Sequence, residues 1–440
     1  MKLTEIFAEF ACAFATRPLE PHVAHHAKRA VIDWYAAVLP GSIIAPSTLL
    51  EQAWADDLDR GGARLVSGRK ATSRAAALIN GTAAHAEEVD DIFRDAIYHP
   101  GAPTIAAALA AAQETSASGE TFLKGVVAGY EVSTRIGAGL GRAHYKYWHN
   151  TGTAGTFGAA AAAASVYGLD AKRYAHALGT SGTFAAGLQQ AFRADSMSKP
   201  LHAGRAAEAG LAAAQMARAG VTGALDIIDG EAGLGRAMGD GPDWAKAVAT
   251  LGRVFNITQM TFKNHACCGH TFAAIDGALA VQKTLGVVHG DIARVAVATY
   301  APALEVAGND HPVSSAEARF SLKYVVATAL VHGSTRLKAF MPERLACKET
   351  RALMTCIDLT VDPEIDARFP NRRAARVAIE TRDGKRADHF QADRKGDPEL
   401  PLSDQDLAEK FAELADPVIG PEKAAALLAR LLGLEREQHV

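Results

Sequence analysis

Three basic side chains stand close together in residues 196–205, which read Ser-Met-Ser-Lys-Pro-Leu-His-Ala-Gly-Arg. They are Lys199, His202 and Arg205, and closely spaced alanine and glycine follow them. Ionisable groups in a close-packed region need a partner, because an unpaired buried charge is costly. A small anionic substrate would supply that partner, so the segment predicts a site for carboxylates.

Two histidines, His99 and His149, each come just before a predicted helix. His99 precedes residues 100–103 (Pro-Gly-Ala-Pro), and His149 precedes residues 150–153 (Asn-Thr-Gly-Thr); an alanine-rich stretch follows both. Free backbone N–H groups and the positive end of a helix favour bound carboxylates. Together with Lys199, these junctions predict one anion site. The alternative is that each histidine only caps a helix or packs.

Residues 85–91 (His-Ala-Glu-Glu-Val-Asp-Asp) bring acids next to a histidine. Treated as helix, the spacing places His85 and Glu88 on one face and Glu87 and Asp91 on another. One carboxylate could orient a histidine or take a proton itself. A solvated acidic helix end is the alternative for Glu87 and Asp91, but less so for Asp90, which has apolar neighbours.

Residues 262–272 (Phe-Lys-Asn-His-Ala-Cys-Cys-Gly-His-Thr-Phe) contain side chains of the types that bind soft metals. The spacing of His265, Cys267, Cys268 and His270 fits no standard zinc pattern, and no second Cys/His pair lies near in sequence. We therefore expect no metal here. The segment is interpreted as a hinge that adds a thiol or imidazole to the site, from Cys268 or His270.

The elements that must position these groups are mostly helices. Up to about residue 263 the pattern is helical almost throughout, and alanine, which favours helix, lets helices approach closely. This predicts a tight multi-helix core. The alanine-rich segments are residues 71–92, 103–115, 154–166 and 203–219.

The pattern then changes to a smaller α+β region. Residues 292–300 and 376–380 carry alternating β-branched residues, and Asp383-Gly384 supplies a hairpin turn before residues 389–391. Residues 314–317 (Ser-Ser-Ala-Glu) have capping-box spacing and predict a helix that runs to Gly333.

The C-terminal part returns to helix. The two prolines of residues 398–401 mark a break, and helical periodicity resumes at 404–415 and 421–433. We expect these two helices to rejoin the large helical domain.

Composition excludes several classes of function. The chain has 440 residues, 49% of them hydrophobic and 22% charged, which is enough core for two or three domains. A net charge of -3 without basic runs argues against nucleic-acid binding. The most apolar stretches are alanine and glycine, and none reaches the ~20 strongly apolar residues of a membrane span.

Two further features bear on location. The N-terminus predicts an amphipathic helix interrupted by acids, with no signal-peptide core. Five cysteines, an odd number without disulfide-like spacing, agree with a reducing compartment. We therefore expect a cytoplasmic protein.

Taken together and in order, several segments resemble the MmgE/PrpD family, which includes 2-methylcitrate dehydratase, cis-aconitate decarboxylase and iminodisuccinate epimerase. The resemblance extends over nearly the whole chain, and its strongest parts are residues 80–85, 99–101, 128–132, 148–149 and 198–204. It implies an all-helical domain from residues 1–263 and 400–440, a smaller α+β lid from residues 264–399, a homodimer and no cofactor. The fold class implied is mainly α.

The resemblance also implies site residues. These are His99, His149 and Lys199, with Asp90 and Asp91 from the acidic segment. Tyr145 is a candidate acid or base, because residues 143–145 (Ala-His-Tyr) resemble a Gly-His-Tyr segment of the epimerase.

Three departures from the family's decarboxylases argue against cis-aconitate decarboxylation. Those members typically read Asp-Phe-Asp-Asp-Thr where this chain has Glu-Val-Asp-Asp-Ile at residues 88–92. A histidine that they carry falls on Cys268, and their lid tyrosine falls near Val306.

The chemistry common to the family is proton movement next to carboxylates. Imidazole suits it, because its unperturbed pKa of about 6.5 lies close to neutral pH. We expect His149 and His99 to transfer protons, with Tyr145 as a possible relay. Lys199 and Arg205 would hold carboxylates and stabilise enolate-like charge.

Two classes of function follow. The first is a lyase or isomerase for a di- or tricarboxylate, with dehydration of a 2-methylcitrate-like hydroxy acid foremost and epimerisation or decarboxylation as alternatives. The second is a carboxylate-binding protein that kept the fold and lost turnover. Glu88, Asp91, His202, Arg205, Cys268 and His270 are the expected substrate-binding residues.

Overall fold

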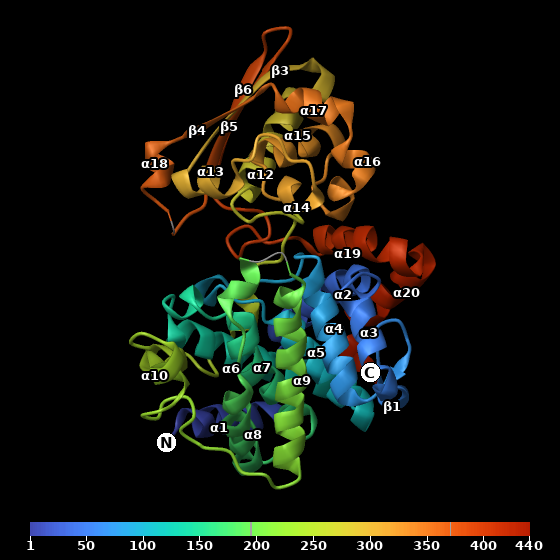
Figure 1. Ribbon diagram of the computed structural model, residues 1–440, viewed down its shortest axis with the longest axis vertical. Coiled ribbons are helices and arrows are strands. Elements are labelled where there is room, and N and C mark those ends of the chain that lie inside the picture. Colours follow the sequence, from blue (N-terminus) through green and yellow to red (C-terminus); the bar gives the residue numbers. More distant parts are fainter. Residues whose placement is uncertain (194–195, 370) are drawn as a thin grey trace. The chain divides into compact units, whose positions relative to one another are not determined.

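The chain folds into two compact units. The computed structural model describes residues 1–193, 196–369 and 371–440. Unit 1 consists of Met1–Thr261 and Ser403–Val440, and unit 2 of Phe262–Leu402. Helices dominate and the sheets are small, so the predicted mainly α fold class is confirmed (Figure 1).

Unit 1 is a bundle of helices with one short β-ribbon. No single described helix is long and apolar enough to cross a membrane; only the bent pair α2 and α3 meets that test together. The helices are α1 (Leu3–Ala15), α2 (Pro21–Ser42), α3 (Ser47–Ala53), α4 (Ser73–Ala86), α5 (Gly101–Thr115), α6 (Gly119–Leu140), α7 (Asn150–Val166), α8 (Ala171–Phe184), α9 (Ser198–Arg218), α10 (Leu234–Met238), α11 (Trp244–Val248), α19 (Asp404–Ile419) and α20 (Pro421–Leu432).

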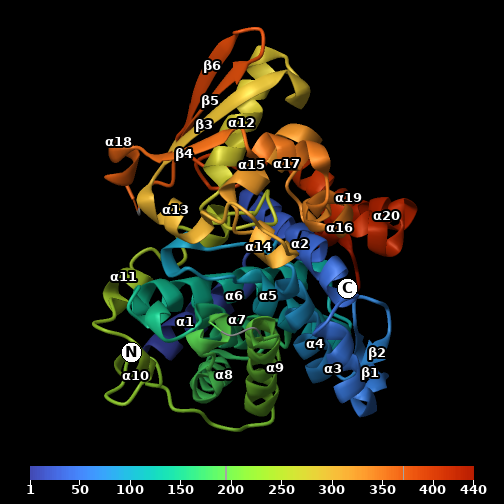
Figure 2. The same ribbon diagram turned by 45° about the horizontal axis from the view of Figure 1, so that its top comes forward.

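Small residues let the central helices of unit 1 pack closely. Helices α4, α5, α6, α7 and α9 lie side by side, and α7 is buried along almost its whole length (Figures 1 and 2). A Cβ built on Gly204 of α9 would lie 2.0 Å from Thr82 Oγ1 of α4. A Cβ on Gly129 of α6 would lie 2.7 Å from the carbonyl oxygen of Gly158 in α7. Glycine is therefore required at both crossings.

The ribbon is an exception within residues 1–263, where the sequence pattern is helical almost throughout. Strand β1 (Leu58–Arg64) pairs antiparallel with β2 (Lys70–Ala71). Gly61 and Gly68 take positive φ angles of 83° and 90°, which residues with a side chain rarely adopt. Turn chemistry overrides helical propensity in this stretch.

Unit 2 is an α+β unit with one four-stranded sheet, in the strand order β4-β3-β5-β6. β3 runs parallel to β4, and β5 is antiparallel to both β3 and β6. Helix α12 packs on β5 and β6 and also contacts α15. The elements are β3 (Ile292–Thr299), β4 (Ile357–Val361), β5 (Ala375–Thr381), β6 (Arg386–Gln391), α12 (Phe272–Leu285), α13 (Ala301–Ala307), α14 (Ser315–Ala318), α15 (Leu322–His332), α16 (Pro342–Leu345), α17 (Lys348–Met354) and α18 (Pro363–Asp366).

The predicted elements of unit 2 form, with one correction. The strands at 292–300 and 376–380 are confirmed, and so is the hairpin at Asp383-Gly384, where Gly384 has φ 84°. The helix predicted from Ser314 to Gly333 is interrupted. Ser314 caps α14 as expected, but Ser321 then accepts a bond from the Tyr324 N–H at 3.3 Å and begins a new helix. Sequence spacing alone does not show that second cap.

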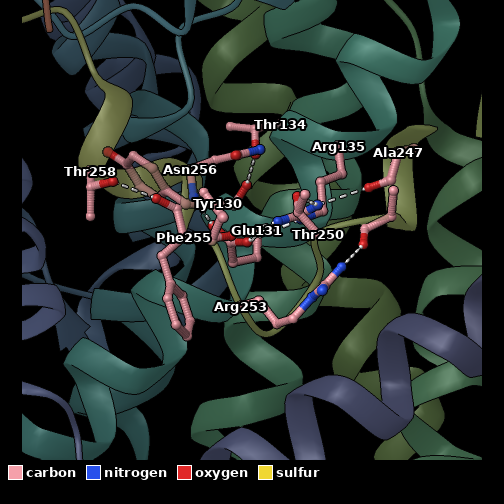
Figure 3. A network of polar contacts seen from close by, with 12 residues as sticks. Tyr130, Glu131, Thr134, Arg135, Ala247, Thr250, Arg253, Phe255, Asn256 and Thr258 are labelled. Atoms are coloured by element: carbon pink, nitrogen blue, oxygen red, sulfur yellow. Dashed lines mark hydrogen bonds and ion pairs between the residues drawn. The ribbon is translucent and has the colours of Figure 1, made fainter.

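A buried network fixes the last part of unit 1 before the chain enters unit 2 (Figure 3). Arg135 of α6 donates to Glu131 Oε2 at 2.9 and 3.0 Å and to the carbonyls of Ala247 and Val254 at 2.9 and 2.7 Å. Burial raises the pKa of Glu131 to about 7 although Arg135 opposes it. Within residues 128–132, Glu131 therefore holds this loop through Arg135, whereas Gly129 allows the close approach of α7.

The C-terminal helices pack onto the N-terminal part of unit 1, where α19 contacts α2 (Figure 1). Lys410 of α19 donates to Asp33 Oδ1 of α2 at 2.6 Å and to the carbonyl of Val89 at 2.7 Å. Both charged side chains are 1% exposed. Val89 precedes Asp90, so the two ends of the chain jointly position the acidic segment.

Replacing Lys410 by Met leaves Asp33 as a buried carboxylate that has lost its ammonium. The expected loss is about 3–5 kcal/mol in the free energy of unfolding, measured by urea denaturation. Lys423→Met, the same change at an exposed site in α20, is the control and should stay within about 0.5 kcal/mol of wild type. Equal stabilities for the two variants would contradict the role assigned to Lys410.

Candidate active site

The acidic segment after α4 is not helical. Helix α4 ends at Ala86, and Glu88 takes the left-handed conformation with φ 59°. The expectation that His85 and Glu88 share a helix face is therefore wrong. The left-handed conformation of Glu88 turns the chain back after the end of α4. Asp90, which is five residues after His85, therefore contacts His85 instead. Ile97 also has a positive φ, 48°, a strained state for a β-branched residue.

Asp90 is a buried carboxylate between two imidazoles. Its Oδ2 lies 2.7 Å from His85 Nδ1 and 3.3 Å from His99 Nδ1. Asp90 and His85 are almost completely buried, whereas the side chain of His99 is 13% exposed. The carboxylate thus fixes the orientation of both rings, and only His99 keeps some access to solvent.

His149 stands at the N-terminus of α7, where it lies among other rings. Its centroid is 5.5 Å from that of His85, with the planes 28° apart, and 4.7 Å from that of Phe192, edge to face. Its Nδ1 lies 3.1 Å from His202 Nδ1 of α9. His85, His149 and His202, from α4, α7 and α9, therefore meet in one cluster.

Lys199 brings a cation to the same cluster. It lies in the first turn of α9, forms an ion pair with Glu88, and places its Nζ 5.0 Å from the centroid of the Phe192 ring. Phe192 thus contacts both Lys199 and His149. The Glu88 carboxylate therefore neutralises the ammonium of Lys199 within this cluster.

Asp91, next to Asp90, has a different environment. It accepts a bond from the Tyr130 hydroxyl at 2.8 Å and from the N–H of Gly101, the first residue of α5, at 3.0 Å. It is 2% exposed. Asp91 therefore ties the acidic segment to α5 and α6 rather than to the imidazoles.

The two aspartates titrate in opposite directions. Burial acts to raise the pKa of Asp90, but the charges and hydrogen bonds of His85 and His99 hold it well below its usual range. Burial, then the charge of Asp33, raises the pKa of Asp91 to about 8. Two carboxyl groups whose pKa values differ in this way take different roles. Asp90 is an ionised anchor, and Asp91 holds its proton near neutral pH.

His149 and His202 are uncharged at neutral pH. Burial, and then the charges of His85 and Lys199, lower the pKa of His149 well below its usual range. The same causes lower the pKa of His202 to about 4. An uncharged imidazole beside an ammonium can accept a proton from a carbon whose neighbouring carboxylate the ammonium holds.

The structure does not bring every expected residue into this cluster. Arg205 points to solvent, with its side chain 59% exposed, and pairs with Glu208 one turn along α9. Tyr145 lies in the 3₁₀ turn of residues 144–146, and its role as acid or base stays a prediction. Cys268 and His270 belong to unit 2, where His270 Nδ1 lies 2.9 Å from the Tyr300 hydroxyl.

Two members of the cluster lay outside the expected set. His85 was expected to pair with Glu88, yet it stands between the rings of His99 and His149 and its Nε2 is buried without a partner among the described residues. Phe192 carried no signal in the sequence, because a lone aromatic residue is most often core. The cluster is recognised only when α4, α7 and α9 are placed together.

Metal ligation has one geometric candidate among the described residues. Donor atoms of His85, Asp90 and His99 all lie within 4.8 Å of one another. In residues 262–272, the His265 ring forms hydrogen bonds with Asp276 and Thr335, and these contacts hold it within unit 2.

A cavity of about 320 Å³ in unit 1 lies away from this chemistry. Its walls include Tyr35, Arg64 and Phe122, and Arg430 and Glu437 on its rim pair with each other at 2.7 Å. None of the clustered histidines lines it. The candidate site therefore rests on the histidine cluster and not on this cavity.

Comparison with known proteins identifies the family of the chain. The MmgE/PrpD N-terminal domain matches residues 5–247, and the MmgE/PrpD C-terminal domain matches residues 265–434. The chain belongs to the MmgE/PrpD family. Relatives of this family member include the cis-aconitate decarboxylase-like protein oryM of Aspergillus oryzae, 29% identical over 95% of this chain and 91% of the relative. The cis-aconitate decarboxylase of Homo sapiens is 28% identical over 82% of this chain and 76% of the relative.

In this MmgE/PrpD protein, the raised pKa of Asp91 predicts how stability depends on pH. Between its unfolded pKa near 4 and its folded pKa of about 8, the folded chain holds a proton that the unfolded chain releases. The contribution of Asp91 to stability is therefore present at low pH and falls as pH rises, by at most about 1.4 kcal/mol per pH unit. Asp91→Asn should remove this slope.

The measurement is urea denaturation of wild type and Asp91→Asn at several pH values between 4.5 and 8. Asp95→Asn, at an exposed carboxylate in the same segment, is the control and should keep the wild-type slope. Parallel curves for wild type and Asp91→Asn would show that Asp91 is ionised throughout this range.

Proposed function

We propose that this protein is a lyase that removes a proton from a carbon next to a carboxylate of a di- or tricarboxylic acid. The first candidate reaction is dehydration of a 2-methylcitrate-like hydroxy acid. The observation that carries the proposal is the cluster itself, in which the uncharged His149 lies beside Lys199 while Asp90 holds His99. The proposed base is His149, the cation is Lys199 and the acid is His99. They lie at the N-terminal ends of α7, α9 and α5.

In this reaction His149 accepts the proton from the α-carbon. The electrons of that C–H bond form the carbon–carbon double bond, and the C–O bond to the hydroxyl group breaks. His99, whose Nδ1 faces the ionised Asp90, is placed to protonate the leaving hydroxyl, which departs as water. Lys199 stabilises the negative charge that gathers on the substrate carboxylate.

The Lys199–Glu88 pair bears on substrate binding. A substrate carboxylate must compete with Glu88 for the ammonium, or take its place. The side chain of Glu88 is 36% exposed, so it can move into solvent when an anion arrives. Glu88 therefore neutralises Lys199 when no substrate is bound, and we propose it as a substrate-responsive residue rather than a direct ligand.

A second candidate, decarboxylation of a cis-aconitate-like acid, is favoured by the names of the relatives. It requires delivery of a proton to carbon after loss of carbon dioxide. The lowered pKa values of His149 and His202 favour abstraction over delivery. Ile92 and Cys268 also depart from the pattern that the family resemblance implies for its decarboxylases. We therefore rank it second. Epimerisation shares the removal of the α-proton, but a proton then returns to the opposite face of the same carbon.

Proton NMR in deuterated water tests the proposal and separates the candidates. The wild-type chain is mixed with citrate-like, aconitate-like and imino-succinate acids. Loss of water gives a vinylic product, loss of carbon dioxide gives a shorter acid, and epimerisation gives exchange at the α-carbon. Binding of these acids without turnover or exchange would instead support the carboxylate-binding alternative.

His149→Gln should lower kcat on the accepted substrate by about 10²–10⁴-fold, because the proton acceptor is lost. The control is His22→Gln, which changes an exposed imidazole of α2 and should leave kcat unchanged. Both variants are assayed after dialysis against EDTA. Wild-type turnover by His149→Gln would exclude His149 as the base.

Asp90→Asn should keep the shape of the carboxylate but not its charge. We expect kcat to fall by at least about tenfold and the acidic limb of the pH–rate profile to shift, because His85 and His99 lose their anionic partner. Asp95→Asn serves as the control. A fall in kcat with an unmoved pH profile would argue for a purely structural role of Asp90.

Two further expectations belong to this proposal. The family resemblance implies a homodimer, and the composition agrees with a cytoplasmic protein. Sedimentation of the purified chain tests the first of these.

A further inference from the structure

Two guanidinium groups converge on one turn of unit 2. The turn is residues 268–271, just before α12. A Cβ built on Gly269 would lie 3.1 Å from Arg394 Nη1 and 4.0 Å from Arg373 Nη1. Gly269 has no side chain, so both groups can approach the turn closely.

The two guanidinium groups differ in their partners among the described residues. Arg394 donates to both oxygens of Asp397, at 2.8 and 2.9 Å, and to the carbonyl of Gly269 at 3.1 Å. In the part of the chain that the structure describes, the Arg373 side chain has no hydrogen bond or ion pair. It is nevertheless mostly buried. A buried cation of this kind needs an anion, and Asp397, the carboxylate whose charge acts on Arg373, already pairs with Arg394.

Residues on both sides of Arg373 in the sequence, Phe369 and Ala374, pack with Tyr300. His270 Nδ1 lies 2.9 Å from the Tyr300 hydroxyl, and Phe369 stacks on the Tyr300 ring at 4.8 Å. Tyr300 belongs to a buried core cluster that also includes Ala374. The Thr299 hydroxyl donates to the carbonyl of Ala374 at 2.9 Å, which anchors the backbone directly after Arg373. The backbone that carries the Arg373 side chain is therefore held in place.

Electrostatics agree with the geometry. Burial, and then the charge of Arg394, lower the pKa of Arg373. Burial and the charges of both arginines lower the pKa of His270 to about 4, so the imidazole is uncharged at neutral pH and can donate or accept a hydrogen bond. The thiol of Cys268 lies in the same field, where burial raises its pKa.

We propose that Arg373, together with His270, binds a carboxylate group on unit 2. The ligand class, a small di- or tricarboxylate, rests on the proposed function, but the site itself does not. A planar guanidinium matches a carboxylate with two parallel hydrogen bonds, and His270 can add a third. The carboxylate would belong either to the substrate of the enzyme or to a separate regulatory acid.

Citrate serves as the probe, and histidine-labelled full-length protein reports its binding by imidazole NMR. The signals of His270 are assigned by their loss in His270→Gln. Citrate should move these signals in wild type, and Arg373→Met should raise the apparent Kd at this ring at least about tenfold, since a charge-assisted pair is lost. Arg372→Met, an exposed neighbour with the same charge change, should leave the Kd unchanged.

Stability supplies a second readout. Without citrate, Arg373→Met should unfold at the same temperature as wild type or a higher one, because a cation without a protein carboxylate is removed. A large fall in Tm would mean that Arg373 has a structural partner and would overturn the proposal. So would His270 signals that citrate leaves unmoved, or equal losses for the changes at residues 372 and 373.

Kinetics distinguish the two sources of the carboxylate. If it belongs to the substrate, Arg373→Met raises KM more than it lowers kcat. If it belongs to a separate acid, the kinetic constants measured without that acid are those of wild type, while citrate binding at His270 is still lost. Failure of the proposed lyase activity would leave the binding experiment unaffected, so the two failures can be told apart.

Discussion

The histidine cluster of unit 1 is organised around one buried carboxylate. Asp90 has no solvent to stabilise its charge, so it is stabilised by the two imidazoles that face its Oδ2. In return it fixes the rings of His85 and His99, and through His85 it sets the environment of His149. Burial, and then the charges of His85 and Lys199, lower the pKa of His149 well below its usual range, and the proposed base requires such an uncharged ring.

Small side chains make this arrangement possible. Helices that carry alanine and glycine at their crossings approach closely enough for histidines from α4, α7 and α9 to touch. The tight packing also removes water, and this raises the pKa of Asp91 while it lowers that of His149. Lys410 of α19 also supports the cluster, because its buried ammonium donates to the carbonyl of Val89 and so anchors the backbone beside Asp90.

Periodic features of the fold could be predicted from the sequence, but local exceptions could not. Alanine content and helix starts predict the long helices, and alternation predicts β3 and β5, because these signals repeat along the chain. The left-handed Glu88 and the second cap at Ser321 are single-residue events without such repetition. Each one redirects a segment, and the first of them exchanges Glu88 for Asp90 as the partner of His85.

The sequence predicts which residues belong to the site better than it predicts the contacts between them. His149, His202 and Lys199 meet because each lies at the start of a helix that the sequence already marks. Arg205, one turn further along α9, faces solvent, since a helix turns its residues by about 100° each and only some of them face the cluster. Phe192, which joins Lys199 to His149, has no pattern of its own.

The protonation state of the His149 imidazole tests the account most directly. Nitrogen-15 NMR of the labelled chain, titrated from pH 5 to pH 8 without substrate, reports whether each ring is neutral or charged. We expect a neutral His149 ring over this whole range, because burial and the neighbouring charges lower its pKa. A His149 ring that is charged at pH 6.5 in the wild-type chain would contradict it.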